Sequence, residues 1–107
     1  MIKEITVQAL NQLRKDGARF KLIDVREVHE VEIATIGGEL IPLGSVPQHI
    51  AQFDQEIEKV IVYCRSGKRS ATAIDLVQSE TGQQNLYNLK GGILEWSDHI
   101  DNSIRKY

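Results

Sequence analysis

The sequence has little of several residue types that mark specialised classes of protein. It holds a single cysteine in 107 residues, which excludes an internal disulfide framework and suits a reducing compartment. It has no apolar run near the roughly 18 residues of a membrane-spanning helix, and its first residues do not open a secretory signal. We therefore expect a cytoplasmic protein, or a domain cut from one, without a membrane partner.

The sequence also lacks a large excess of charge of one sign and any cluster of metal ligands. The formal net charge of −2 argues against a general nucleic-acid binder. No Cys-x-x-Cys pair or Cys/His cluster offers metal-ligand spacing, so we expect no metal and no other cofactor. The content of 41% hydrophobic and 26% charged residues is ordinary for a globular chain. This length supports one core, which predicts a single domain over residues 1–107.

Strand-like and helical patterns alternate along the chain. The expected strands are 2–5, 20–25, 40–41, 60–63 and 85–89, and the expected helices are 7–15, 27–33, 47–53, 71–81 and one that carries Ile93, Leu94 and Trp96. In the second helix we expect Val28 and Val31 or Ile33 to face the core. Residues from Asp101 onward read as a polar tail. The alternation predicts an α/β fold, with helices on both faces of a parallel sheet.

The only cysteine, Cys64, lies where the predicted strand 60–63 ends, and a short loop leads from it into the next helix. A helix start leaves backbone N–H groups unpaired and carries partial positive charge, so it attracts anions. Gly67 permits a tight backbone turn within this loop. The loop is therefore suited to hold an anion on sulfur.

Three cations follow Cys64 closely in the sequence. Arg65, Lys68 and Arg69 lie within five positions of one another, and they predict a lowered pKa for the Cys64 thiol. A lone cysteine is often only a small buried hydrophobe, and a basic loop is often only a solvated turn. The strand end, the glycine, the cations and the helix start together favour a reactive thiolate.

Acidic residues are expected near this loop. Asp24 ends a predicted strand, and the carboxyl ends of parallel strands share one edge of a sheet, so Asp24 and Cys64 are expected to lie close together. Arg69 would then pair with Asp24, which favours bracing of the loop over direct contact with a substrate. Asp24 suits either a general base or an ion-pair anchor, and we favour the anchor. Glu27 and Glu30 either belong to the same charged network or lie on the surface of a short helix, and we favour the surface.

Four segments of the chain resemble the rhodanese family of sulfurtransferases, and they occur in that family's order. The segments are LIDVRE at 22–27, IP at 41–42, VYCRSGKRS at 62–70 and LKGGILEW at 89–96. The resemblance implies a rhodanese-like α/β fold with a five-stranded, mostly parallel sheet. It also implies a persulfide carried on Cys64 and a cradle lined by backbone amides from Arg65 to Arg69.

The resemblance assigns roles to individual residues. Cys64 and Arg69 are the predicted catalytic residues, and Asp24 and Arg26 are predicted to support the site through ion pairs. The predicted substrate-binding residues lie between the catalytic two: Arg65, Ser66, Gly67 and Lys68. The two cations among them either tune the choice of sulfur donor or are ordinary solvated charges.

The implied activity is sulfur transfer. The Cys64 thiolate takes sulfur from a sulfane-sulfur donor such as thiosulfate and passes it to a thiophilic acceptor, which is cyanide in an assay. Residues 36–50 and 96–101 resemble the rhodanese domain that ends certain ubiquitin-activating-like proteins. Those proteins adenylate a small carrier and supply it with sulfur in molybdopterin, thiamine or tRNA thiolation pathways. A small sulfur-carrier protein or a fused adenylating domain is therefore an expected partner.

Two other functions stay open at this point. Cysteine phosphatases and arsenate reductases have a related cysteine–arginine cradle, but the phosphatases resemble C-x5-R, whereas four residues separate Cys64 from Arg69. The shorter loop suits a persulfide better than a tetrahedral phosphate. Rhodanese-like domains that have lost the cysteine serve as non-catalytic binding modules, and the presence of Cys64 argues against that function.

Overall fold

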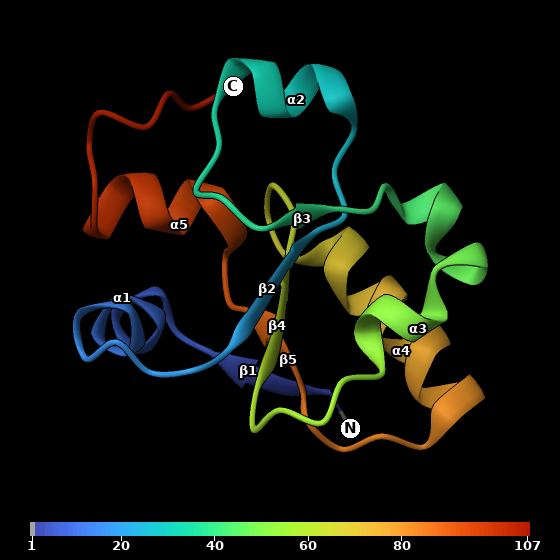
Figure 1. Cartoon of the computed structure of the whole chain (residues 1–107). Coiled ribbons are helices and arrows are strands. Elements are labelled where there is room, and N and C mark those ends of the chain that lie inside the picture. Colours follow the sequence, from blue (N-terminus) through green and yellow to red (C-terminus); the bar gives the residue numbers. More distant parts are fainter. Residues whose placement is uncertain (1) are drawn as a thin grey trace.

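The computed structural model describes residues 2–107, so Met1, the first residue of the predicted domain, lies outside the described residues. Strands and helices alternate along the chain (Figure 1). The strands are β1 (Lys3–Ile5), β2 (Lys21–Asp24), β3 (Glu39–Leu40), β4 (Val60–Tyr63) and β5 (Leu86–Leu89). The helices are α1 (Val7–Lys15), α2 (Val28–Ile33), α3 (Ile50–Phe53), α4 (Lys68–Thr81) and α5 (Gly92–His99), with a 3₁₀ helix η1 (Leu43–Gln48).

The strands form one sheet in the order β1-β5-β4-β2-β3, and each pair of neighbours within residues 2–107 is parallel. The predicted five-stranded α/β sheet is thus confirmed. Asp24, the last residue of β2, lies in register with Tyr63, the last residue of β4. The segments that follow these two strands therefore start side by side at the carboxyl edge of the sheet.

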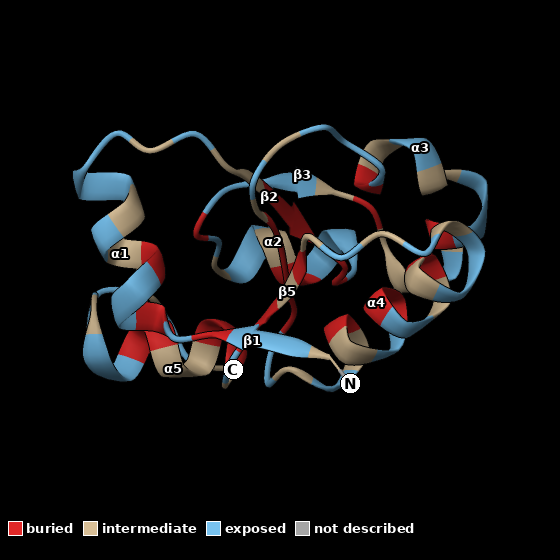
Figure 2. Ribbon diagram, turned by 90° about the horizontal axis from the view of Figure 1, so that it is seen from below, coloured by how far each residue is buried: buried red, intermediate tan, exposed pale blue. Residues whose placement is uncertain are grey.

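Alternate side chains of β4 enter two separate cores. Val60 and Val62 belong to the core beneath α3 and α4, whereas Ile61 and Tyr63 belong to the core beneath α1 and α5. All four side chains are fully buried, which explains why this strand is continuously apolar. Figure 2 shows the buried strands inside and the exposed sides of the helices outside. The prediction of helices on both faces is confirmed.

Helix α2 buries a different face from the one that was predicted. Val28 is 60% exposed and Ile33 is 39% exposed, while Glu30 is only 6% exposed. The expectation is therefore wrong for Val28, and of the two alternatives Val31 is half-buried whereas Ile33 is exposed. The reason is the position of the helix: α2 lies beyond the carboxyl edge of the sheet (Figure 1), where Arg69 and the Tyr107 hydroxyl bind the Glu30 carboxylate.

The predicted helix over residues 47–53 is two short helices instead. Pro47 lies inside η1, and α3 begins only at Ile50. His49 separates them because its backbone, with φ of −130° and ψ of 27°, leaves the helical conformation.

The predicted polar tail packs onto the molecule. Ile104 and Tyr107 lie against the core beneath α1 and α5. The Ser97 hydroxyl, on α5, donates a hydrogen bond of 2.7 Å to the backbone oxygen of Ile104. Polar residues alternate with these two anchors, so composition alone suggested a solvated segment. Within residues 2–107, no helix has the length and apolar character needed to cross a membrane.

Candidate functional site

Cys64 follows β4 directly at the carboxyl edge of the sheet, and a short loop joins it to α4. Gly67 caps the start of α4 with a φ of 104°, a left-handed conformation that side chains disfavour. The helix begins at Lys68 rather than at the predicted Ala71. The strand, glycine turn and helix start that the sequence predicted around the cysteine are therefore all present.

The Cys64 thiol is surrounded by hydrogen-bonding groups of its own loop and of the first turn of α4, and Cys64 is 1% exposed. The backbone N–H groups of Gly67 and Ser70 lie 3.1 and 3.4 Å from Sγ, and the Ser70 hydroxyl oxygen lies 3.4 Å from it. Burial acts to raise the pKa of Cys64, but the hydrogen bonds outweigh it, and the pKa lies below its ordinary value. The predicted direction is thus confirmed. The main cause of the lowering is hydrogen bonding to the sulfur, and among the three cations Arg69 adds an attraction to its charge.

Arg69 binds Glu30 and not Asp24. Its Nη1 and Nη2 atoms lie 2.6 and 2.8 Å from the two carboxylate oxygens of Glu30, a bidentate arrangement. The hydrogen bond from Arg69 lowers the pKa of Glu30 to about 2, against the effect of burial and with help from a tyrosine hydroxyl. The predicted Arg69–Asp24 pair and the favoured surface position of Glu30 are therefore wrong, and the alternative that Glu30 belongs to the charged network is confirmed. Glu27 is exposed as expected.

Asp24 is occupied by its neighbour Arg26. Arg26 Nε lies 3.0 Å from Oδ1 and Nη2 lies 2.8 Å from Oδ2, and the two side chains are 0% and 2% exposed. Arg26 Nη2 also donates to the backbone oxygen of Ala34 at 2.9 Å. Both charges are paired and hydrogen-bonded away from water. This geometry favours the ion-pair anchor over the general base for Asp24.

Tyr107 joins the two ion pairs, and reasoning from the sequence missed it. Its hydroxyl accepts a hydrogen bond of 3.0 Å from Arg26 and donates one of 2.7 Å to Glu30. Its backbone oxygen accepts a bond of 2.6 Å from Nε of Arg65, whose guanidinium lies 5.2 Å from the centre of the Tyr107 ring. The last residue of the chain therefore contacts one arginine of the Cys64 loop directly and reaches Arg69 through Glu30.

The predicted substrate-binding residues lie around the mouth of the loop. Arg65, Ser66 and Lys68 are exposed and Gly67 is half-buried. Arg65 is held by Tyr107, so the two exposed cations of the loop differ in their freedom to turn toward a ligand.

A buried polar pair behind Cys64 was also missed. Ser70 is 0% and Asn88 is 6% exposed. The Ser70 hydroxyl lies 2.5 Å from Oδ1 of Asn88, and Nδ2 of Asn88 lies 3.0 Å from the backbone oxygen of Gly67. The one signal in the sequence is an asparagine inside the otherwise apolar strand β5.

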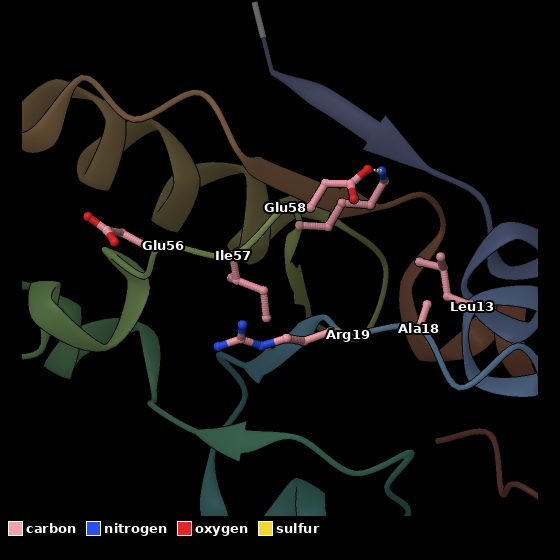
Figure 3. Close-up of a pocket in the computed structure, with 7 residues that line it drawn as sticks. Leu13, Ala18, Arg19, Glu56, Ile57 and Glu58 are labelled. Carbon is pink, nitrogen blue, oxygen red and sulfur yellow. Dashed lines mark hydrogen bonds and ion pairs between the residues drawn. The ribbon is translucent and has the colours of Figure 1, made fainter.

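The cavity drawn in Figure 3 lies away from this site. Its volume is about 320 Å³, and its lining comes from α1 and from the segments that precede β2 and β4: Leu13, Ala18, Arg19, Glu56, Ile57, Glu58 and Lys59. These segments enter the sheet at the edge opposite Cys64, and no residue of the loop 64–70 lines the cavity. Among residues 2–107, no three His, Cys, Asp or Glu side chains gather where they could hold a metal ion.

Comparisons with known proteins point to one family. The family model described as "Rhodanese-like domain" matches residues 6–99. A "Putative thiosulfate sulfurtransferase, mitochondrial" from Schizosaccharomyces pombe is 38% identical over 74% of this chain and 64% of its own length. A "Sulfurtransferase" from Allochromatium vinosum is 31% identical over 92% of each chain.

Other relatives are much longer than this chain. The "Probable adenylyltransferase/sulfurtransferase MoeZ" of Mycobacterium tuberculosis is 31% identical over 96% of this chain but only 26% of its own length. Among solved structures, a rhodanese-like domain protein from Staphylococcus aureus superimposes with a TM-score of 0.80, at 21% identity and 99% coverage of both chains. That likeness shows the fold.

Proposed function

Because this chain belongs to the family of rhodanese-like domains, we propose that it is a sulfurtransferase that carries sulfur as a persulfide on Cys64, and that residues 1–107 form one such domain. The observation that carries the proposal is the set of N–H donors aimed at Sγ of Cys64 from Gly67 and Ser70. Such donors stabilise a negative charge on sulfur, which both a thiolate and a persulfide bear.

The proposed reaction has two displacements. The Cys64 thiolate attacks the outer sulfur of thiosulfate, a bond forms between the two sulfurs, and the S–S bond of thiosulfate breaks as sulfite leaves with the electron pair. A nucleophile such as cyanide then attacks the terminal sulfur, and Sγ leaves as the thiolate. The exposed loop residues Arg65, Ser66 and Lys68, together with Gly67, would hold the anionic donor. Arg69, fixed by Glu30, would stabilise the charged sulfur from the side.

The loop length supports sulfur chemistry over phosphate chemistry. A phosphate on a cysteine needs N–H donors around three equatorial oxygens, at about 2.7–3.1 Å from each. Four residues between Cys64 and Arg69 give a smaller ring than five, and a smaller ring suits the single terminal sulfur of a persulfide. A phosphatase is therefore the less favoured function.

We further propose that the physiological partners are a sulfane-sulfur donor and a small sulfur-carrier protein, as in molybdopterin biosynthesis. The similarity to MoeZ, whose printed name joins an adenylyltransferase to a sulfurtransferase, supports this proposal. This chain spans about a quarter of that relative, so an adenylating partner would be a separate or adjoining unit. A thiolate that must stay reduced between turnovers suits the cytoplasm.

Intact-mass measurement after incubation with thiosulfate tests the proposal. The wild type should gain one sulfur, about 32 Da, as a persulfide on a reactive thiolate, and should then lose it to cyanide as thiocyanate. Cys64→Ser should gain nothing, and Lys68→Gln should still form the adduct but need more thiosulfate to do so. An adduct on the serine variant, or faster hydrolysis of an aryl phosphate than transfer of sulfur by the wild type, would overturn the proposed function.

A further inference from the structure

The side chains of Ser70 and Asn88 form an ordered chain of hydrogen bonds behind Cys64. Nδ2 of Asn88 donates to the backbone oxygen of Gly67, an atom that can only accept, so Oδ1 must face Ser70. Oδ1 can also only accept, so the Ser70 hydroxyl donates its single proton to it, over 2.5 Å. The neighbours of the amide therefore fix both its orientation and the position of the Ser70 proton.

This arrangement leaves Ser70 without a proton for the sulfur. In the thiol form, the S–H group donates to the Ser70 oxygen, 3.4 Å away, and every member of the chain is satisfied. When the thiol proton leaves to solvent, a lone pair of that oxygen faces a negative charge. The hydroxyl can relieve the conflict by rotating about its Cβ–Oγ bond toward the sulfur, but Oδ1 of the buried Asn88 then loses its donor.

We propose that Asn88 is a positioning residue that competes with the sulfur of Cys64 for the hydroxyl proton of Ser70. A neutral thiol leaves that proton with Asn88, and a thiolate or persulfide anion draws it to the sulfur. No proton leaves Ser70 in either case. The inference rests on the proposed function only in taking Cys64 as the reacting sulfur, and it adds a device that controls the charge on that sulfur.

The other charged groups near Cys64 do not take part in this competition. Arg69, on α4, attracts the Cys64 charge but is hydrogen-bonded to Glu30. Arg65 and Lys68 are exposed on the loop, and Asp24 on β2 is paired with Arg26. Within the part of the chain that the structure describes, none of these side chains makes a hydrogen bond with Ser70.

The wild-type protein allows a direct test by NMR across pH. The side-chain carbonyl carbon and NH₂ resonances of Asn88 should shift with the same midpoint as the alkylation rate of Cys64, because the donor to Oδ1 departs as the thiol ionises. Asn85 is the matched control, since its Nδ2 donates to the backbone oxygens of Gln55 and Ile57 at the opposite edge of the sheet. Its resonances should not follow that midpoint, and in Cys64→Ser the Asn88 titration should vanish. Asn88 resonances that stay constant through the Cys64 midpoint would overturn the proposal.

A double-mutant cycle provides the second test. Asn88→Leu keeps the approximate shape but removes the acceptor, and it is made both in the wild type and in Ser70→Ala. Asn88→Leu should lower the pH midpoint of Cys64 alkylation more in the wild type than in Ser70→Ala. The expected difference between the two effects is half a pH unit or more, about a threefold change in the ionisation equilibrium. Asn88→Leu also removes the hydrogen bond to the backbone oxygen of Gly67. That loss occurs in both backgrounds, so it cancels in the comparison. Equal effects in the two backgrounds would refute the competition. If the Asn88 resonances and the Cys64 alkylation titrate as expected but thiosulfate forms no persulfide, the proposed function alone would be refuted.

Discussion

The two edges of the sheet differ in how their polar and charged side chains are placed: at one edge they are buried and bound to one another, and at the other they are exposed. Among residues 2–107, every buried polar or charged side chain except that of Ser97 lies at the carboxyl edge, and each is bound to another member of the group or to the segment 64–70. At the opposite edge the cavity of Figure 3 is bordered by charges such as Glu58, whose side chain is 84% exposed in its pair with Lys59. A cavity often marks the binding site of a protein, but here the polar side chains bind one another at the carboxyl edge, away from this cavity.

Breaking one buried ion pair should have the largest effect. Asp24→Asn leaves the fully buried guanidinium of Arg26 without its counter-charge, and we expect a loss of about 3–5 kcal/mol in the free energy of unfolding. Glu39→Gln, which breaks the partly exposed Lys21–Glu39 pair, should cost less than about 1 kcal/mol. Urea unfolding measures both. Equal losses in the two variants would mean that the edges do not differ as described.

Alanine substitutions at two glycines distinguish the cost of steric crowding from the cost of backbone strain. Gly92 has a φ of 63°, and a Cβ there would lie 2.5 Å from the backbone oxygens of Cys64 and Arg65, whereas Gly82 has a φ of 71° with open space around it. Gly82→Ala should cost about 1–2 kcal/mol from strain alone. Gly92→Ala should cost about 1–3 kcal/mol more because it also displaces the loop. Thermal unfolding compares the two variants, and matching losses would disprove the close approach of α5 to the loop.

Acid should weaken the carboxyl edge through Glu30. Its folded-state pKa of about 2 is depressed from an ordinary 4.5, so its contribution to stability is complete above pH 4.5 and is lost as the pH falls through 2. We expect a loss of about 1–3 kcal/mol over that interval. Glu30→Gln should flatten this part of the pH profile in urea unfolding, and Glu58→Gln should not. An unchanged profile in Glu30→Gln would contradict the pairing with Arg69.

The smallest expected effect is that of a single hydroxyl. Tyr107→Phe keeps the ring beside Arg65 but removes the hydrogen bonds to Arg26 and Glu30, which should cost about 1 kcal/mol. Tyr87→Phe is the control, because that ring lies between Lys3 and Lys59, about 5.5 and 5.4 Å from their Nζ atoms. Thermal unfolding of both variants sharpens the comparison. A larger loss for Tyr87→Phe would show that Tyr107 does not join the two ion pairs.

Local patterns were sufficient to predict most of the fold and the position of the cysteine loop. The strand Val60–Tyr63 has its predicted bounds because four successive apolar residues suit a strand buried on both faces. Gly67 and Gly82 mark the two ends of α4 because both adopt left-handed conformations.

The partners within the site could not be predicted in the same way. Arg69 lies 39 positions from Glu30, and both Asp24 and Glu30 are acids at the same edge. The choice between them follows from Arg26, which reaches Asp24 first because it is only two positions away. Tyr107 was beyond prediction for a similar reason, since its segment is polar and its contacts depend entirely on the folded arrangement. The fold was thus readable from periodicity, while the pairing of charges required three-dimensional proximity.

The contact between α5 and the cysteine loop has a consequence for biosynthesis. The backbone oxygens of Cys64 and Arg65 accept hydrogen bonds from the N–H groups of Ile93 and Leu94, at 3.0 and 3.2 Å. During translation, Cys64 is therefore synthesised well before α5, whose N–H groups bind the cysteine loop. The growing polypeptide would expose an ordinary, weakly acidic cysteine, and the reactive form would arise only when translation has passed residue 94. Under the proposed function, this order of synthesis would keep the Cys64 thiol in its weakly acidic form until α5 has joined the loop.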